Sequence, residues 1–192
     1  TRGEYDAVSG GWAHKLVTYF FNKGFENGVH NTHEVYALGI SGETTVEALS
    51  RIESEFLVRR DKDMQPVFIF AYGANDSAFY VSESRFAVSK DAFKDALKKL
   101  VAIANKYNAK TILVNITPVI EEKNREPNHR RKVRSNTYVE EYNEIVKQVA
   151  DEENVRHVDV YSLFNEADPS SLFIEDGLHP NSLGHEIIFD AV

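Results

Sequence analysis

Two short segments of this chain are apolar at nearly every position, and an amphipathic segment of helical length separates them. Residues 66–72 read PVFIFAY and residues 111–116 read TILVNI. Consecutive apolar side chains are typical of parallel-sheet strands that are covered on both faces. The apolar face between them is formed by Phe93, Leu97, Leu100, Val101 and Ala104. This alternation predicts a three-layer α/β domain with a largely parallel sheet and right-handed crossovers, which binds ligands at the carboxyl ends of its strands.

The rest of the chain continues the alternation. We expect a helix over residues 11–21, with Gly24 as its C-terminal stop, and a buried strand over residues 33–40. Thr44 and Glu47 have the spacing of a capping box at the start of the next helix. The remaining expected elements are a helix from residue 136, a strand over residues 155–160 and a final helix capped by Asn181.

Size and charge limit the classes of protein to consider. The 192 residues, 42% of them hydrophobic, fit a single domain over residues 1–192. A net charge of -8 disfavours nonspecific binding to nucleic acid. The longest apolar stretches are far shorter than the roughly 20 residues of a membrane-spanning helix, so we expect no stable membrane insertion.

The cellular location is only weakly constrained by the sequence. The chain has no cysteine, which suits a reducing cytoplasm and an exported enzyme equally well. No signal peptide is visible, and this favours the cytoplasm. Secretion stays open because the chain starts abruptly at Thr1-Arg2-Gly3, without an initiator Met.

The strongest chemical motif is Asp176-Gly177-Leu178-His179-Pro180-Asn181. An Asp three residues before a His, on one turn, can reach the imidazole Nδ1 and stabilise the imidazolium that forms when Nε2 accepts a proton. The pair therefore forms two members of a possible catalytic triad. The alternative for this spacing is a surface turn before an ordinary helix.

Two turns that follow expected strands carry candidate hydrogen-bond donors. The backbone N–H of Gly42 would lie beside a helix N-terminus, where developing negative charge is favoured. Asn75, in Gly73-Ala74-Asn75-Asp76, offers a side-chain amide of the kind that completes an oxyanion hole. The alternative for each is a tight turn, with Asn75 bonding its own loop.

Taken in order, GISGETT, GAND and DGLHPNSLGH resemble the SGNH hydrolases, also called GDSL esterases and lipases. The resemblance covers the chain from Gly10 to Val192. It implies a flavodoxin-like, five-stranded α/β/α sandwich, with Gly42 and Asn75 as oxyanion-hole donors. It also implies that His179 is the general base and then the general acid, that Asp176 orients it, and that no metal or organic cofactor is needed. The implied substrate is a small-molecule carboxylic ester, such as a short acyl ester, a lysophospholipid or an acetylated sugar.

The sequence departs from the family at its first block. In the family a strand ends in Gly-Asp-Ser, whose Ser is the nucleophile and a third oxyanion donor, whereas this chain starts with residues that normally follow that Ser. We therefore expect that the polypeptide continues before Thr1 and that the first strand and the nucleophile lie there. Ser9, Ser41 and Ser77 are near the expected site, but each reads as a turn or cap residue.

Two further features have mainly structural interpretations. The segment His30-Asn31-Thr32-His33 offers two imidazoles but no third ligand nearby, so surface histidines are expected and no metal site. Residues 117–135 are polar and predict a long loop or lid that carries the basic cluster His129-Arg130-Arg131-Lys132-Val133-Arg134. We interpret the cluster as solvated; folded over the site, it would favour acidic esters or phospholipid head groups.

A second hypothesis belongs to a different class of protein. A non-catalytic α/β module that binds a small ligand or nucleotide at the sheet edge would explain the architecture and the absent serine together. No G-x-G-x-x-G or Walker loop follows an expected strand, and the Asp176–His179 spacing would have no purpose in such a module. The oligomeric state is not indicated by the sequence.

Overall fold

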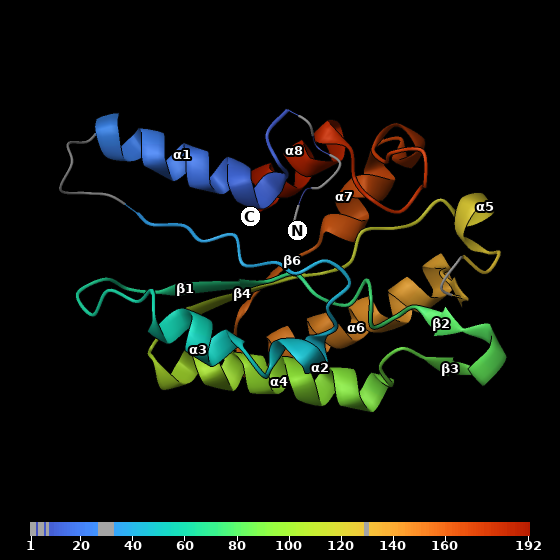
Figure 1. The fold of residues 1–192 in the computed structure, drawn as a ribbon, viewed down its shortest axis with the longest axis horizontal. Helices are drawn as coiled ribbons and strands as arrows, with labels where there is room; N and C mark the ends of the chain where they lie inside the picture. The colour runs from blue at the N-terminus through green and yellow to red at the C-terminus, as the bar shows by residue number, and fades with distance from the viewer. Residues whose placement is uncertain (1–2, 4–5, 7, 27–32, 129–130) are drawn as a thin grey trace.

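The computed structural model of the chain describes residues 3, 6, 8–26, 33–128 and 131–192. Its centre is a parallel sheet in the order β1-β4-β6, formed by Val67–Phe70, Lys110–Val114 and Arg156–Val158. The register pairs Val67 with Lys110 and Ile112 with Arg156. Helices cover both faces of this sheet (Figure 1). The predicted three-layer α/β class with a parallel sheet is confirmed.

The helices divide between the two faces. One face carries α1 (Trp12–Glu26), α7 (Val160–Glu166) and α8 (Ser182–Ala191). The other carries α2 (Thr45–Ala48), α3 (Ile52–Leu57), α4 (Lys90–Lys106) and α6 (Asn136–Glu153). Because the strands are parallel, α4 and α6 serve as the crossovers that return the chain to the start of the next strand.

Each face of the sheet has its own hydrophobic core. Beneath α4 and α6, Phe93, Leu100, Leu113 and Tyr142 are fully buried. The second core packs Trp12, Val114, Val158 and Phe164 between α1, α7, α8 and the sheet. The helical faces predicted from spacing on α4 and α6 are the faces that the structure buries.

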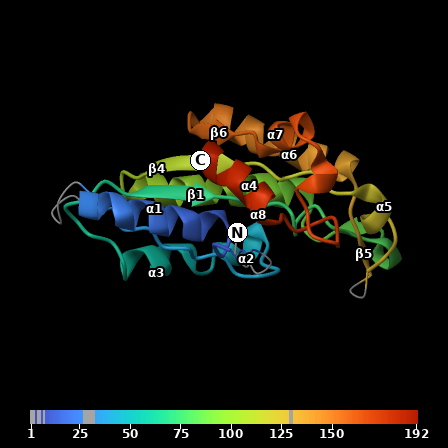
Figure 2. The same cartoon turned by 90° about the horizontal axis from the view of Figure 1, so that it is seen from above.

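A second, small antiparallel sheet lies at one end of the molecule (Figures 1 and 2). Its order is β3-β2-β5, from Arg85–Phe86, Phe79–Tyr80 and Lys132–Val133, and the short helix η1 (Val81–Glu83) joins β2 to β3. Figure 2 shows α5 (Glu121–Asn124) at the same end and α1 at the other. Residues 117–135, predicted as a long loop or lid, therefore contain a helix and a strand.

Three other local predictions need correction. Residues 33–40 do not form a strand: within the described residues no strand pairs with them, although Val35 packs into the core beneath α1. The central sheet accordingly lacks a strand from these residues and has three strands in the described part of the chain. Gly24 is buried inside α1 rather than ending it. The helix after Thr44 is divided into α2 and α3 around Arg51, whose φ is -127°.

Candidate active site

Asp176 and His179 form the hydrogen bond that their spacing predicts. Asp176 Oδ2 lies 2.6 Å from His179 Nδ1, while Oδ1 accepts the backbone N–H groups of Leu178 and His179 at 2.9 and 3.0 Å. Burial opposes ionisation of Asp176, but the hydrogen bonds from His179 and Leu178 outweigh it and lower the pKa of this carboxyl. An ionised Asp176 holds the imidazole by Nδ1 and leaves Nε2 as the proton-accepting atom.

Local sequence explains why this turn has its shape. Gly177 adopts a φ of +65°, and a Cβ on it would lie 2.7 Å from the Cβ of Ile120. Asn181 caps α8 by accepting the N–H groups of Leu183 and Gly184 at 2.9 and 3.1 Å, as predicted. The turn is thus held between a required glycine and a capped helix, with His179 half exposed beside them.

Residues in and next to α5 hold the Asp176–His179 turn by donating hydrogen bonds to its backbone carbonyls. Ile120 N–H donates to the Gly177 carbonyl at 2.8 Å, and Lys123 Nζ donates to the Glu175 carbonyl at 2.8 Å. The side-chain amide of Asn124 donates to the carbonyls of Asp176 and Gly177 at 3.1 and 3.2 Å. No local pattern in the sequence indicates these contacts, because they join positions about fifty residues apart.

The two candidate oxyanion turns lie side by side. The Asn75 side-chain amide donates to the backbone carbonyl of Glu43 at 3.0 Å, and Asp76 Oδ1 accepts the N–H of Thr45 at 2.9 Å. Gly42 adopts a φ of +80° in the turn that precedes Glu43. Asn75 therefore bonds the turn of Gly42 rather than its own loop. Because a side-chain amide carries two hydrogens, this bond occupies one and leaves a second for a ligand.

An ion pair that the sequence analysis missed fixes the Gly42 turn. Arg51 Nε donates to Glu43 Oε1 at 2.6 Å, its Nη2 also binds Glu43, and Nη2 reaches the Leu38 carbonyl at 2.9 Å. Tyr72 Oη donates to Glu43 Oε2 at 2.9 Å. Burial, and next the bond to Glu43, raise the pKa of Tyr72 well above its ordinary value, so Tyr72 remains a donor. The Glu43 side chain is only 7% exposed, so this charge is almost wholly compensated within the protein.

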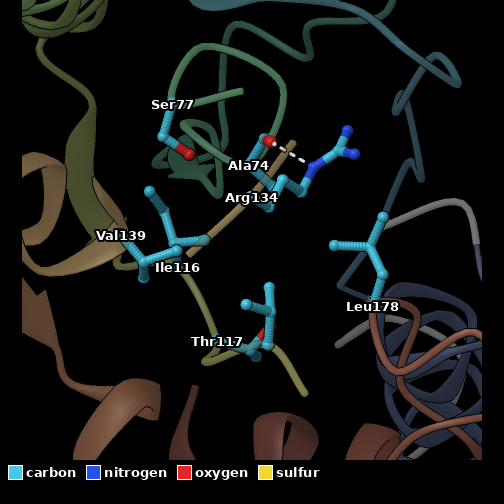
Figure 3. Close-up of a pocket in the computed structure, with 8 residues that line it drawn as sticks. Ala74, Ser77, Ile116, Thr117, Arg134, Val139 and Leu178 are labelled. Carbon is cyan, nitrogen blue, oxygen red and sulfur yellow. Dashed lines mark hydrogen bonds between the residues drawn. The ribbon is translucent and has the colours of Figure 1, made fainter. Parts of the chain in front are cut away.

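A small cavity is lined by Ala74 from the Asn75 loop and by Leu178 from the His179 loop (Figure 3). The cavity has a volume of about 20 Å³, and Ala74, Thr117, Arg134 and Leu178 are among the residues that line it. Arg134 Nε donates a long hydrogen bond of 3.5 Å to the Ala74 carbonyl. These contacts connect the Gly42 turn to the Asn75 loop, and the Asn75 loop to the His179 loop, at the carboxyl ends of β1 and β4.

The basic cluster is only partly described, and one member contradicts its interpretation as solvated. Arg134 is 9% exposed because it reaches inward to the Ala74 carbonyl, whereas Arg131 is exposed. His129 and Arg130 lie outside the described residues. The cluster is therefore divided between the site and the surface rather than solvated as a whole.

The other sequence candidates occupy structural positions where they are described. Ser9 Oγ donates to Asp6 Oδ2 at 2.6 Å, Ser41 is exposed in the turn before Gly42, and Ser77 is 2% exposed and lines the small cavity with Ala74. The ring of His33 stacks on Phe20 with centroids 5.2 Å apart, while residues 30–32 lie outside the described residues. In the part of the chain that the structure describes, no group of three His, Asp or Glu side chains could hold a metal ion.

Comparisons with known proteins agree on one family and one fold. The model of the GDSL-like lipase/acylhydrolase family matches residues 1–187. A relative from Bacillus subtilis (strain 168), described as the uncharacterized lipoprotein YqeF, is 26% identical over 184 residues, covering 83% of this chain and 72% of the relative.

Two crystal structures share the fold. The lipase/acylhydrolase from Enterococcus faecalis has a TM-score of 0.69 at 20% identity, covering 92% of this chain and 81% of its own. Axe2, an acetylxylan esterase from Geobacillus stearothermophilus, has a TM-score of 0.69 at 23% identity, covering 98% of this chain and 82% of its own.

Proposed function

Because this chain belongs to the GDSL-like lipase/acylhydrolase family, we propose that it hydrolyses carboxylic esters through a Ser-His-Asp triad. The observation that carries the proposal is the 2.6 Å contact between Asp176 Oδ2 and His179 Nδ1, beside the linked turns of Gly42 and Asn75. A base oriented by a carboxylate and a pair of donors for an oxyanion are the parts that acyl transfer needs.

In the proposed reaction, a serine hydroxyl attacks the ester carbonyl carbon while His179 Nε2 accepts the hydroxyl proton. The N–H groups of Gly42 and Asn75 stabilise the tetrahedral oxyanion, and the imidazolium returns the proton to the leaving alcohol. Water, deprotonated by the same nitrogen, then attacks the acyl-serine and releases the acid and the free serine. Asp176 stays ionised and stabilises each imidazolium.

The nucleophilic serine belongs, in this proposal, to a strand preceding Thr1 that pairs with the outer edge of β1. Two features support this position. In the described part of the chain, β1 has a strand partner on one side only, and Val67 at its start is 52% exposed. An apolar parallel strand with an open edge gains both hydrogen bonds and burial from another neighbour. The residues encoded before Thr1 test it directly: a strand ending in Gly-Asp-Ser is expected.

We propose a short acyl group, such as acetyl, on the ester. The cavity between the Asn75 and His179 loops holds about 20 Å³, which is room for one water-sized group. The structural neighbour Axe2 is an acetylxylan esterase, which agrees with this size and extends the proposal to acetylated sugars. Falling rates from 4-nitrophenyl acetate to the octanoate are expected. Equal rates across the series would remove the size argument.

The activity itself is tested with the full natural chain and a fluorophosphonate label. A single labelled serine and loss of turnover in His179→Ala are expected, while His14→Ala, on an exposed face of α1, serves as the control. Failure of the label to attach, together with no ester turnover by the natural chain, would favour the non-catalytic binding module instead. Full turnover in His179→Ala would remove His179 from the proposed triad.

We propose that the protein is exported, in place of the cytoplasmic location that the sequence favours. The B. subtilis relative is described as a lipoprotein, which supports an exported protein held at the membrane surface. Among the described residues, no helix is long and apolar enough to cross a membrane. Cell fractionation tests the location, and recovery of the protein in the cytosolic fraction alone would reject export.

A further inference from the structure

An open groove of about 450 Å³ is lined in part by Gly42 and by no residue of the Asp176–His179 turn. Thr44 and Glu47, at the start of α2, form one wall. Tyr80, Arg85 and Lys132, from the small antiparallel sheet, form the other. Because Gly42 lines the groove, a ligand bound in it can place its ester carbonyl at the proposed oxyanion donor.

The second wall concentrates positive charge. Tyr80 on β2 is paired with Arg85 on β3 and with Lys132 on β5, so the two cations flank it from both neighbouring strands. The Arg85 guanidinium lies 4.9 Å, and the Lys132 ammonium 4.8 Å, from the centroid of the Tyr80 ring. The negative face of an aromatic ring attracts cations, and here one ring holds two of them at the same groove.

These charges are not balanced inside the groove. Arg85 is paired with Glu83, but within the described residues Lys132 forms no ion pair. Glu47 on the facing wall accepts the N–H and the hydroxyl of Thr44 at 2.8 and 2.7 Å, and those bonds lower the pKa of its carboxyl. The groove is therefore lined by two cations and one carboxylate, and Glu47 is close enough for Lys132 to contribute to its lowered pKa. One positive charge remains in excess along the groove, in a chain whose net charge is -8.

From this arrangement we propose that the groove is a subsite for an anionic group on the ester, with Lys132 and Arg85 as specificity-determining residues. The inference rests on the proposed esterase function, whose ester carbonyl would lie at Gly42. A carboxylate fits the groove better than a neutral sugar ring. The Tyr80 ring, which would stack on a sugar, is instead occupied by cations, and the Glu47 carboxylate is engaged by Thr44.

The test compares esters that differ only in charge, using the full natural chain. For an anion on the acyl side, the pair is 4-nitrophenyl hemiglutarate and the corresponding glutaric monoamide ester. For an anion on the alcohol side, the pair is acetylated glucuronic acid and its carboxamide. For the side of the ester that occupies the groove, kcat/KM is expected to be about two- to fivefold higher for the anionic ester than for the neutral one. A gain of this size is typical of a partly exposed ion pair.

Three variants separate charge from structure. Lys132→Met is expected to remove the preference, and Lys132→Arg to retain it because the charge remains. Lys99→Met, on the exposed face of α4 and paired with Asp95, is the matched control and should leave the ratio unchanged. A ratio near one for both pairs in the natural protein, or one that Lys132→Met does not lower, overturns the inference.

Binding of the product acids keeps this inference separate from the catalytic proposal. Titration calorimetry with glutarate and with glucuronate is expected to show weaker binding to Lys132→Met for one of them, whether or not esters are hydrolysed. Absent turnover of all esters would reject the proposed function, while equal binding of these acids to both proteins would reject the subsite.

Discussion

The side-chain amide of Asn75 donates a hydrogen bond to the backbone carbonyl oxygen of Glu43 across 3.0 Å. The two residues belong to turns that lie thirty-two positions apart in the sequence. Together with the bond from Thr45 N–H to Asp76 Oδ1, this bond holds the Asn75 loop against the Gly42 turn, so the proposed oxyanion donors are positioned by each other as well as by their own loops.

Replacing Asn75 by Ala is expected to lower kcat by about two to three orders of magnitude, the usual cost of losing one oxyanion donor. KM should change much less, because the donor acts mainly on the transition state. Steady-state kinetics on 4-nitrophenyl acetate measures both. Asn105→Ala, an exposed position near the end of α4, removes the same side chain away from the site and should have no effect. Equal losses in the two variants would contradict a role for Asn75.

Arg51→Met is expected to destabilise the fold by about 3 kcal/mol, because it leaves the buried carboxylate of Glu43 without its cation. The double variant Glu43→Gln with Arg51→Met should recover part of that loss, since no buried charge then remains. Denaturant unfolding of the two single variants and the double variant completes the cycle. Simple addition of the two single effects would show that the pair does not act as a unit.

Asp176→Asn is expected to lower kcat by about two to four orders of magnitude while leaving the fold intact. The amide can no longer stabilise an imidazolium, although it can still bond the N–H groups of Leu178 and His179. Steady-state kinetics on 4-nitrophenyl acetate measures kcat, and denaturant unfolding checks that the fold is intact. An unchanged kcat would remove Asp176 from the proposed triad.

His185 is expected to make stability fall as the pH is lowered from about 6.5 to about 4. Burial lowers the pKa of His185 to about 4, and in its neutral form Nδ1 accepts the N–H of Trp12 at 3.4 Å. Its ordinary value is about 6.5. The unfolded chain therefore binds a proton at a pH where the folded chain does not, and this favours unfolding. Above about 6.5 neither state is protonated and the contribution is fully present.

Unfolding measurements between pH 4 and 7 test this contribution. His185→Gln should flatten the dependence in this window, and His14→Gln, at an exposed position on α1, should leave it as in the natural protein. An identical slope for His185→Gln and the natural protein would exclude His185 as its source.

Local patterns predicted the features that local chemistry determines. The capping box of Thr44 and Glu47, the cap at Asn181 and the Asp176–His179 contact each involve residues within three positions of one another. The buried faces of α4 and α6 followed from helical spacing in the same way. In such cases the nearest neighbours along the chain supply most of the physical constraint.

The incorrect predictions concern interactions over longer distances. Residues 33–40 have the composition of a strand, but strand formation requires a hydrogen-bonding neighbour, and none pairs with them among the described residues. The acidic balance of the whole chain favours a solvated basic cluster, yet its member Arg134 is buried against the Ala74 loop. The Arg51–Glu43 pair and the anchoring of the His179 turn by Asn124 likewise depend on tertiary contacts that no short motif encodes.

The close approach of Gly177 to Ile120 also constrains how homologues of this chain can diverge. A methyl group at position 177 would fall 2.7 Å from the Ile120 Cβ, and the backbone there has a positive φ. A lineage that acquires any other residue at 177 would need both a smaller residue at 120 and a turn that tolerates the strain. Positions 120 and 177 should therefore vary as a pair among natural sequences, so that sequence change beside α5 is limited by the shape of the distant Asp176–His179 turn.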